Sequence, residues 1–515
     1  MDLEVDYKKY LEAVEKHSRV FFVLISHIME KGYEGNFSQL FLARLKVEAG
    51  HLEDFLDYYG CLHNKQWFPV REAVAVVKSF SGCCFKCTRL IEQLPKKKIL
   101  ADETEFKYDI NEAYNLLKKA LYNSGLNAIT QFKKVNIVFN VCPIECSFYN
   151  DYPDLGYLER NRKKRSIKTA EQAAVSLATS FLNIAEDFSQ LKKIVKTKKS
   201  DYLSMIPDVF DEAKLMQFEN KFHSLQSLFD TYLSESIKLN SDKTLPGLKC
   251  YISVIYHLLD ISTKCSHYIE RHATFLKPTL FNSVIPPASD IDIVTIIIDI
   301  FIRYALELSD KAQRLCKETL LNYEKRGKIR VRIPNYRGFH VRPSTLIAKI
   351  VIHYGTEIKM IMDDKTYNAA IPLELFRANE VINAQKRFMI NKVVNNMDFI
   401  KKKNALPLDS LQLKTALRNV YMDLMENEDI TLYNKSFSFE DLPPIHGEKI
   451  SSYAKRAITH HLATGTLDIK SDQMVFFEGD VRVLEDIKIL AENGYGEDKF
   501  GNNIVLPKEL SYLRR

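Results

Sequence analysis

Few residues in this chain interrupt a helix. There are 17 Gly and 16 Pro among 515 residues, and the Gly content is about half or less of ordinary usage. Gly and Pro are the residues that most disfavour the interior of a helix. A chain with so few of them is expected to fold mainly into α-helices and, at ordinary domain sizes, into about three domains.

Residues 2 to about 325 carry the spacing that buries one face of a helix. Thr169 and Gln172 form a capping-box pattern. Behind them apolar residues recur every three or four positions, as in an amphipathic helix: Val175, Ala178, Phe181, Leu182, Ala185 and Phe188. The segment 142–157, with two prolines and a glycine, is expected to separate two helical bundles, residues 1–150 and 151–326.

The most apolar stretch is not expected to cross a membrane. Residues 291–308 contain four charged side chains, Asp292, Asp299, Arg303 and Glu307, and such charges are costly in lipid. The first ten residues are polar and lack the apolar core of a signal peptide. We therefore expect a buried helix here, no membrane span and a cytoplasmic protein.

The hydrophobic pattern changes to period two at Gly327. Residues 328–333 alternate between charged and aliphatic, which predicts a half-buried strand. We then predict a helix over about 343–353, strands over 357–362 and 365–369 joined by Asp363-Asp364, and a second helix over 372–379. Residues 327–395 are thus expected to form an α/β module inside an otherwise helical chain.

Residues 396–515 are expected to form a helical extension and a small α+β C-terminal domain. The pattern predicts a helix over 448–462, a short strand over 474–477 and a helix over 481–493. The Gly-rich stretch 494–501 lacks the strand–loop–helix frame of a phosphate-binding motif. We interpret this stretch as a loop.

The segment 335–346 combines residues suited to phosphoryl chemistry. His340 is predicted just before a helix N-terminus, where free backbone N–H groups and the helix dipole favour an anion. Gly338 permits a tight backbone turn, Pro343 suits the first turn of a helix, and Arg342 can donate two hydrogen bonds to phosphate oxygens. An imidazole is nucleophilic when neutral and titrates near neutrality. Further phosphate-supporting donors are predicted from Ser344 and Thr345.

These residues resemble the signature of HPr, the histidine-containing phosphocarrier family of the bacterial sugar phosphotransferase system. The matching positions are Asn335, Gly338, His340, Arg342, Pro343 and Ser344, and the match lies within about residues 328–385. The resemblance implies an open-faced β-sandwich, phosphorylation of His340 through Nδ1, support of the phosphoryl group by Arg342, an enzyme I-like donor and an IIA-like acceptor. We expect a carrier or regulator rather than a turnover enzyme, with no cofactor and no metal.

The sequence also departs from the family pattern. Phe339 replaces an aliphatic residue, and Ile371 falls where many members have a regulatory serine, so serine-kinase control is not expected. Glu374 and Arg377 replace apolar or small residues on the second helix, whose partner surface is therefore altered. After Asn379 no clear counterpart of the family's last strand and last helix follows, and how the sheet is completed stays open.

Two other functions are weighed against the carrier. A structural or interaction protein could keep the module's fold without phosphotransfer. Nucleic-acid binding would use the net charge of +7 and four short basic runs, at 96–98, 160–165, 192–199 and 401–403. It is not expected, because the sequence shows no basic face with interleaved aromatic residues.

Metal binding has little support in the sequence. Cys83, Cys84 and Cys87 lie in an apolar run, where free cysteines usually pack as small hydrophobic residues, although with Cys142 and Cys146 they have the number of ligands for zinc. The polar helix face around Glu48 and His51, spaced i, i+3, could also hold a metal, but we interpret it as local ion pairs.

Overall fold

The computed structural model describes residues 6–93, 103–138, 158, 167–205, 211–234, 244–272, 286–403, 409–433, 442–498 and 500–513. The described residues are mainly helical and include a small antiparallel sheet, as the predicted fold class requires. The chain divides into two compact units, Met1–Thr319 and Leu320–Arg515.

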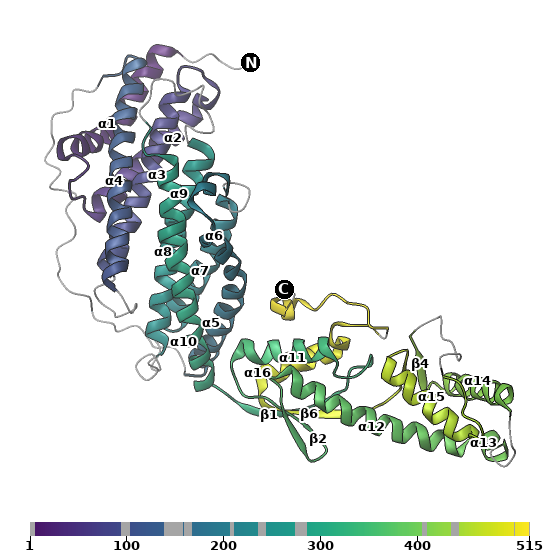
Figure 1. Cartoon of the computed structure of the whole chain (residues 1–515). Coiled ribbons are helices and arrows are strands. Elements are labelled where there is room, and N and C mark those ends of the chain that lie inside the picture. The colour runs from purple at the N-terminus through teal and green to yellow at the C-terminus, as the bar shows by residue number, and fades with distance from the viewer. Residues whose placement is uncertain are drawn as a thin grey trace. The chain divides into compact units, whose positions relative to one another are not determined.

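The first unit is built of helices. They are α1 (Tyr7–Lys31), α2 (Gln39–Tyr58), α3 (Phe68–Gln93), α4 (Glu103–Lys134), α5 (Ile167–Phe188), α6 (Lys192–Val195), α7 (Glu212–Tyr232), α8 (Thr244–His272), α9 (Asp290–Thr295) and α10 (Arg303–Asn322), which runs into the second unit. Figure 1 shows α1 to α4 side by side and α8 next to them, where α8 packs against α3 and α7. Their apolar stripes meet in a core that includes Phe21, Phe80, Phe132, Phe181 and Tyr268, each almost fully buried.

Two details of the first unit differ from the sequence predictions. Helix α5 begins at Ile167, so Thr169 lies inside its first turn and the predicted capping box is wrong. The predicted buried helix over 291–308 exists, but a π-helical segment, Ile296–Ile302, joins α9 to α10. A π turn inserts an extra residue into the helical repeat and so shifts which side chains face the core. Here Ile296 and Ile298 are buried, whereas Ile300 is partly exposed. The predicted break at 142–157 lies outside the described residues.

The second unit alternates strands and helices. Its elements are β1 (Arg326–Arg332), α11 (Val341–Tyr354), β2 (Lys359–Met362), β3 (Lys365–Asn368), α12 (Pro372–Asn396), α13 (Asp398–Lys403), α14 (Ser410–Glu426), β4 (Ile430–Leu432), α15 (Ile450–Thr464), β5 (Leu467–Ile469), β6 (Met474–Asp480) and α16 (Val481–Glu492). The helix predicted over 372–379 therefore continues much further, and strands β4 and β5 were not predicted.

A four-stranded sheet with the order β1-β6-β2-β3 forms the base of this unit, and every neighbouring pair is antiparallel. Period two sends alternate side chains to opposite faces. In Figure 1, α11, α12 and α16 lie on one side of the strands. The core between the sheet and these helices includes side chains at most 5% exposed: Val331, Val475, Phe477, Met360, Ile347, Ile350, Leu484 and Ile487.

The sheet is completed from a distant part of the sequence. Strand β6 inserts between β1 and β2, and α16 packs on both β1 and β6. Residues 397–473, between α12 and β6, hold α13, α14, β4, α15 and β5 around a second core, which the C-terminal half of α12 also enters and which includes Leu417, Tyr421, Tyr453 and Ile458. We call residues 397–473 the insertion. The sheet that begins in the predicted module 327–395 thus extends to residues 474–480.

Candidate functional site

The predicted phosphoryl site lies where β1 leads into α11. His340 is the N-cap residue of α11, with φ −77° and ψ −171°, and its carbonyl accepts the first helical hydrogen bond, from Ser344 N at 3.2 Å. The helix begins at Val341, two residues before the predicted start, so Arg342 and Pro343 both lie in its first turn. The imidazole therefore stands at the end of the helix where backbone N–H groups lack intrahelical partners.

Gly338 has the backbone conformation that its residue type permits. Arg337 and Gly338 have φ of 52° and 60°, in the left-handed region. Asn379 of α12 bridges this turn: its Nδ2 donates to the Arg337 carbonyl at 2.9 Å, and its Oδ1 accepts from Phe339 N at 3.0 Å. A Cβ atom at position 338 would lie 2.1 Å from Asn379 Oδ1. The close approach of α12 therefore requires glycine.

The imidazole of His340 is partly accessible and has a carboxylate partner. Its side chain is 21% exposed, and Nε2 lies 2.8 Å from Oε2 of Glu497, whose side chain is only 6% exposed. The ring of Tyr336 packs edge-on against the imidazole at a centroid distance of 5.4 Å. The ring is held from two sides and is not sealed in the protein interior.

Arg342 is close to the same carboxylate. Its Nε lies 3.8 Å from Glu497 Oε1, which is beyond hydrogen-bond distance, and its side chain is 34% exposed. Within the described part of the chain, this buried Nε has no hydrogen-bond partner. A donor of this kind, next to a helix N-terminus, is available to an anion.

The hydroxyl groups of Ser344 and Thr345 do not serve as predicted. Ser344 is buried and its Oγ donates to the Phe339 carbonyl at 3.0 Å, while Thr345 Oγ1 donates to the Val341 carbonyl at 2.6 Å. Both hydroxyls are therefore committed to the local backbone. Their structural part is to fix the turn that carries His340, and the Ser344 backbone N–H is also committed, to the His340 carbonyl.

The insertion contributes to the same turn. Asp468 of β5 accepts the Arg337 backbone N–H at 2.9 Å and pairs with Lys386 of α12 at 2.8 Å, both side chains being at most 4% exposed. The Arg337 guanidinium donates to the Thr464 carbonyl, and Tyr433 packs on Tyr336 at 4.7 Å between ring centroids. The backbone before His340 is thus held by residues of the insertion and α12, and these contacts could not be predicted from the sequence.

The cysteines near residue 84 pack as expected from their apolar surroundings. Cys83, Cys84 and Cys87 are buried in α3, and Cys83 Sγ lies 3.8 Å from Sγ of Cys265. Burial raises the pKa of the Cys84 and Cys87 thiols well above their ordinary value, which disfavours the thiolate that metals and electrophiles require. Cys142 and Cys146 lie outside the described residues.

The polar face around Glu48 is a network of ion pairs. Glu48 pairs with Arg44 at 2.7 Å, and Arg71 pairs with Glu53, Asp57 and Glu72 at 2.7 to 3.1 Å. Among the described residues, no group of three or more His, Cys, Asp or Glu side chains could hold a metal ion.

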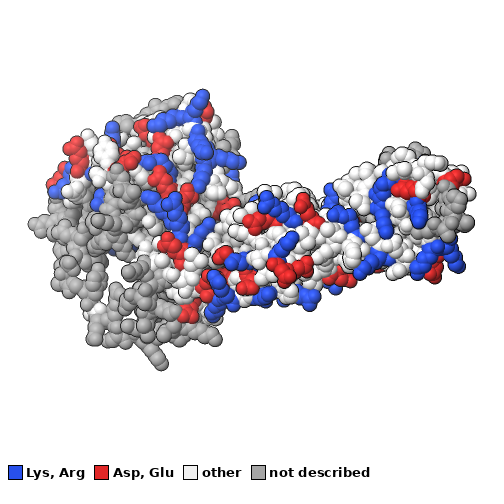
Figure 2. Space-filling view, turned by 60° about the horizontal axis from the view of Figure 1, so that its bottom comes forward, with Lys and Arg blue, Asp and Glu red and all other residues white. Residues whose placement is uncertain are grey.

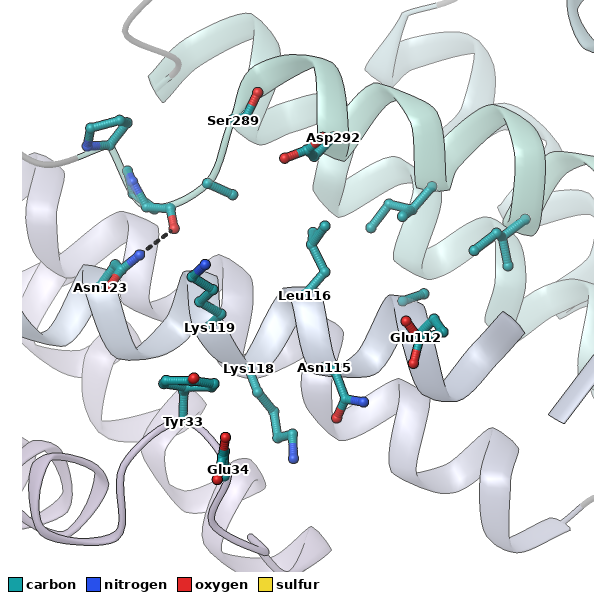
Figure 3. A pocket seen from close by; sticks show the side chains of 16 residues that line it. Tyr33, Glu34, Glu112, Asn115, Leu116, Lys118, Lys119, Asn123, Ser289 and Asp292 are labelled. Atoms are coloured by element: carbon teal, nitrogen blue, oxygen red, sulfur yellow. Dashed lines mark hydrogen bonds between the residues drawn. The ribbon is translucent and has the colours of Figure 1, made fainter. Parts of the chain in front are cut away.

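A pocket of about 900 Å³ lies in the first unit, between α4, the segment 286–289 and the helix that follows it. Figure 3 shows its mixed lining, with Asn123 Nδ2 donating to the Pro287 carbonyl at 3.0 Å. The charged side chains carry both signs: Lys118, Lys119, Glu34, Glu112 and Asp292. Because side chains of both signs line the pocket, it favours neither an anionic nor a cationic ligand. None of the candidate functional motifs of the sequence lies in it.

Across the described residues, no helix combines the length and the apolar character needed to cross a lipid bilayer. Comparison of the chain with protein-family models, with curated proteins and with solved structures gave no match.

Proposed function

We propose that this protein is an HPr-like phosphocarrier or phosphorelay regulator of a phosphotransferase system, in which His340 accepts the phosphoryl group. The observation that carries the proposal is the position of His340 as a partly exposed N-cap residue beside Arg342. A neutral imidazole can attack phosphorus, and the phosphoryl charge would meet the N-terminus of α11 and the Arg342 guanidinium. An exposed charge at a helix N-terminus gains only about 0.3–1 kcal/mol, which suits a carrier that must release its group.

The order of elements in the second unit supports this proposal. The sequence indicated strand, helix, hairpin and helix, and left the last strand and last helix of the resemblance without a counterpart. Strand β6 follows the insertion and joins the same sheet. Helix α16 comes directly after β6 and packs on that sheet. A module with this order is consistent with the family that the motif resembles.

Exposed apolar side chains near the start of α11 and α12 support docking of a protein partner. Val341 is 71% exposed and Leu373 is 60% exposed, and Ile371 and Phe376, close to Leu373 in sequence, are 42% and 41% exposed; exposed apolar groups that form one patch mark protein contacts. Glu374, which departs from the family pattern, accepts the Asn368 backbone N–H at 2.5 Å. Its carboxylate therefore stabilises the hairpin-to-helix corner, so the departure has a local structural role.

The proposal is tested by incubating the full chain with enzyme I preparations and labelled phosphoenolpyruvate. The expected result is an acid-labile, base-stable label that His340→Ala abolishes. His446→Ala is the matched control, because His446 is an exposed histidine of the same unit. Absence of label in the wild-type chain with several enzyme I preparations would contradict the carrier function.

Such a negative result would favour the second candidate, an interaction protein that keeps the module without phosphotransfer. The observation in its favour is that a buried carboxylate already occupies Nε2 of His340. A histidine held in this way could be a structural residue of the turn, and in that case His340→Ala would lower stability without any effect on labelling.

Nucleic-acid binding has one observation of its own. On the sheet face away from the helices, Phe476 is 37% exposed, with Lys328 Nζ 4.8 Å and Arg330 5.7 Å from its ring centroid. These cations already contact the ring that a base would stack on. Figure 2 shows acidic side chains interspersed with basic ones over the face that it draws. Salt-sensitive binding of mixed single-stranded RNA or DNA, lost in Phe476→Ala, would favour this candidate.

A further inference from the structure

We propose that Glu497 is a positioning residue for phosphoryl transfer: its carboxylate keeps the His340 proton on Nε2 and so leaves the lone pair of Nδ1 free to attack. This inference rests on the proposed function, in which Nδ1 is the acceptor atom. It assigns a role to a residue that lies beyond the region of family resemblance, 157 residues from the histidine in sequence.

The geometry fixes the direction of the hydrogen bond. Glu497 Oε2 lies 2.8 Å from His340 Nε2, and a carboxylate can only accept a hydrogen bond. A neutral imidazole has one donor nitrogen and one acceptor nitrogen, so the nitrogen that faces Glu497 must carry the hydrogen. The other nitrogen, Nδ1, then holds the lone pair.

The backbone of the segment 494–498 places this carboxylate firmly. Gly494, Tyr495 and Gly496 all have left-handed φ, at 61°, 58° and 80°. The Tyr495 side chain is 1% exposed, its hydroxyl donates to the Arg332 carbonyl at 2.6 Å, and its ring packs on Phe339 at 5.9 Å between centroids. The segment is therefore anchored to the end of β1 and to the residue before His340.

Contacts on the C-terminal side of Glu497 close the loop. Ile504 N donates to the Gly496 carbonyl at 3.0 Å, and Asp498 accepts the Asn502 backbone N–H at 2.9 Å. Gly496 is also tightly enclosed, because a Cβ there would lie 3.1 Å from Leu346 Cδ1 of α11. Glu497 is held on both sides along the chain, as a group that orients another side chain must be.

The transfer step balances without any further acid or base. The Nδ1 lone pair of His340 forms a bond to the phosphorus of a phosphohistidine on the donor protein, the donor N–P bond breaks, and its electron pair returns to the donor imidazole. The His340 ring gains positive charge while the hydrogen stays on Nε2, and the Glu497 carboxylate offsets that charge. Transfer to an acceptor reverses these bond changes and returns the same neutral tautomer.

The same contact could act in the opposite way, as a lock that competes with the phosphoryl group for Arg342. The two roles predict opposite effects of Glu497→Gln. A glutamine amide can keep the geometry but can donate to Nε2, which favours the tautomer with the hydrogen on Nδ1. Removal of a positioning group slows phosphorylation, whereas removal of a lock accelerates it.

The tautomer is measured first, by ¹⁵N NMR of the full chain labelled at histidine, with His340→Ala to assign the signals. We expect the Nε2–H tautomer in the wild-type chain and in Glu492→Gln, and a shift toward Nδ1–H in Glu497→Gln. Glu492 is a suitable control because its side chain is 62% exposed and faces Lys488. A wild-type His340 with its hydrogen on Nδ1 would overturn the inference.

The rate is measured next with phosphoramidate, a small donor that phosphorylates histidine without a partner protein. We expect Nδ1-phosphohistidine at position 340 by ³¹P NMR, formed about tenfold or more slowly in Glu497→Gln, since the wrong tautomer is known to be costly in catalysis. An equal or faster rate in Glu497→Gln would overturn the inference. If the proposed function fails but the role of Glu497 holds, the results differ. Phosphoramidate would still label Nδ1 more slowly in Glu497→Gln than in the wild-type chain, but enzyme I would not label the wild-type chain.

Discussion

Position 338 shows how one residue type is dictated by its neighbours. The left-handed backbone of Gly338 costs an ordinary residue about 1–2 kcal/mol, and its α-hydrogens face Asn379 where a methyl group would collide. The bridge from Asn379 holds both sides of the turn, so the position of His340 depends on this contact.

We expect Gly338→Ala to destabilise the turn by about 2–4 kcal/mol, because it adds backbone strain and breaks hydrogen bonds of Asn379. Amide hydrogen exchange of residues 335–354 measures this loss as a lower free energy of local opening. Gly447→Ala is the control: Gly447 has a similar φ of 76° but no neighbouring atom within 4 Å of an added Cβ. Equal losses in the two variants would contradict the role of Asn379.

The residues of the site divide by their distance in sequence. His340, Arg342 and Gly338 could be predicted, because their spacing places them together in one turn. The hydroxyls of Ser344 and Thr345 bond to the nearby backbone, and the sequence could not show this commitment. Asn379 and Glu497 were missed because their contacts with the turn span 40 and 157 residues. The Gly-rich stretch 494–501 carried the only signal, and it was interpreted as a plain loop.

At the scale of elements, a buried ion pair connects α12 to the insertion. Lys386 and Asp468 are both almost fully buried, and Asp468 also accepts the Arg337 backbone N–H. Removal of one partner leaves a buried charge uncompensated, which usually costs about 3–5 kcal/mol.

We therefore expect Lys386→Met to lower the free energy of local opening of α12 and β5 by about 3–5 kcal/mol, measured by amide hydrogen exchange. The control is Lys470→Met, which removes a solvent-exposed partner of Glu428 and should leave exchange unchanged. If Lys386→Met lowered the free energy of local opening as little as the control does, the backbone N–H donors alone would be enough to stabilise the Asp468 carboxylate.

A second, partly buried carboxylate holds the C-terminal residues against α11 and α16. Asp486 Oδ2 accepts from the hydroxyls of Tyr354 at 2.9 Å and Tyr512 at 2.6 Å. Burial raises the pKa of the Asp486 carboxyl above its ordinary value, and the two hydroxyl donors oppose that rise. Because the folded state then binds more protons than the unfolded state, stability falls as pH rises from the ordinary Asp pKa of about 3.9 through the raised value.

We expect Tyr512→Phe to cost about 1.5–3 kcal/mol at a pH above the raised Asp486 pKa, where the carboxyl is charged, and less below the ordinary Asp pKa, where it is protonated. Amide exchange of residues 481–492 at several pH values measures this difference. Asp486→Asn should remove the pH dependence in both backgrounds. A loss in Tyr512→Phe that does not change with pH would show that packing of the ring, not the hydrogen bond, stabilises this segment.

Most elements of the second unit could be predicted, but their partners could not. Period two indicated β1, and the sequence also predicted strands at the positions of β2, β3 and β6 and helices at those of α11, α15 and α16. Helix α12 continues without a break past residue 379, and its charged C-terminal half packs Ile390 and Val394 into the insertion core. Strands β4 and β5 are three residues each, too short for a periodic signal.

At the scale of the whole molecule, the sequence predicted a mainly helical chain with one α/β region, and the structure agrees. It could not predict that β1 pairs with β6, because alternation specifies a buried face and not a partner strand. The pairing Val331 with Val475 and Ile329 with Phe477 joins residues nearly 150 positions apart across the insertion. The predicted module and the predicted C-terminal piece therefore share one sheet, and their common core positions the turn of His340.

The most direct test of the account is to locate the phosphoryl group on the chain. After incubation with enzyme I and phosphoenolpyruvate, the full protein is digested without acid, and tandem mass spectrometry maps the modified residue. We predict phosphate on His340 and on no other histidine. Phosphate on a different residue, or none on a chain that a working donor has met, would contradict it.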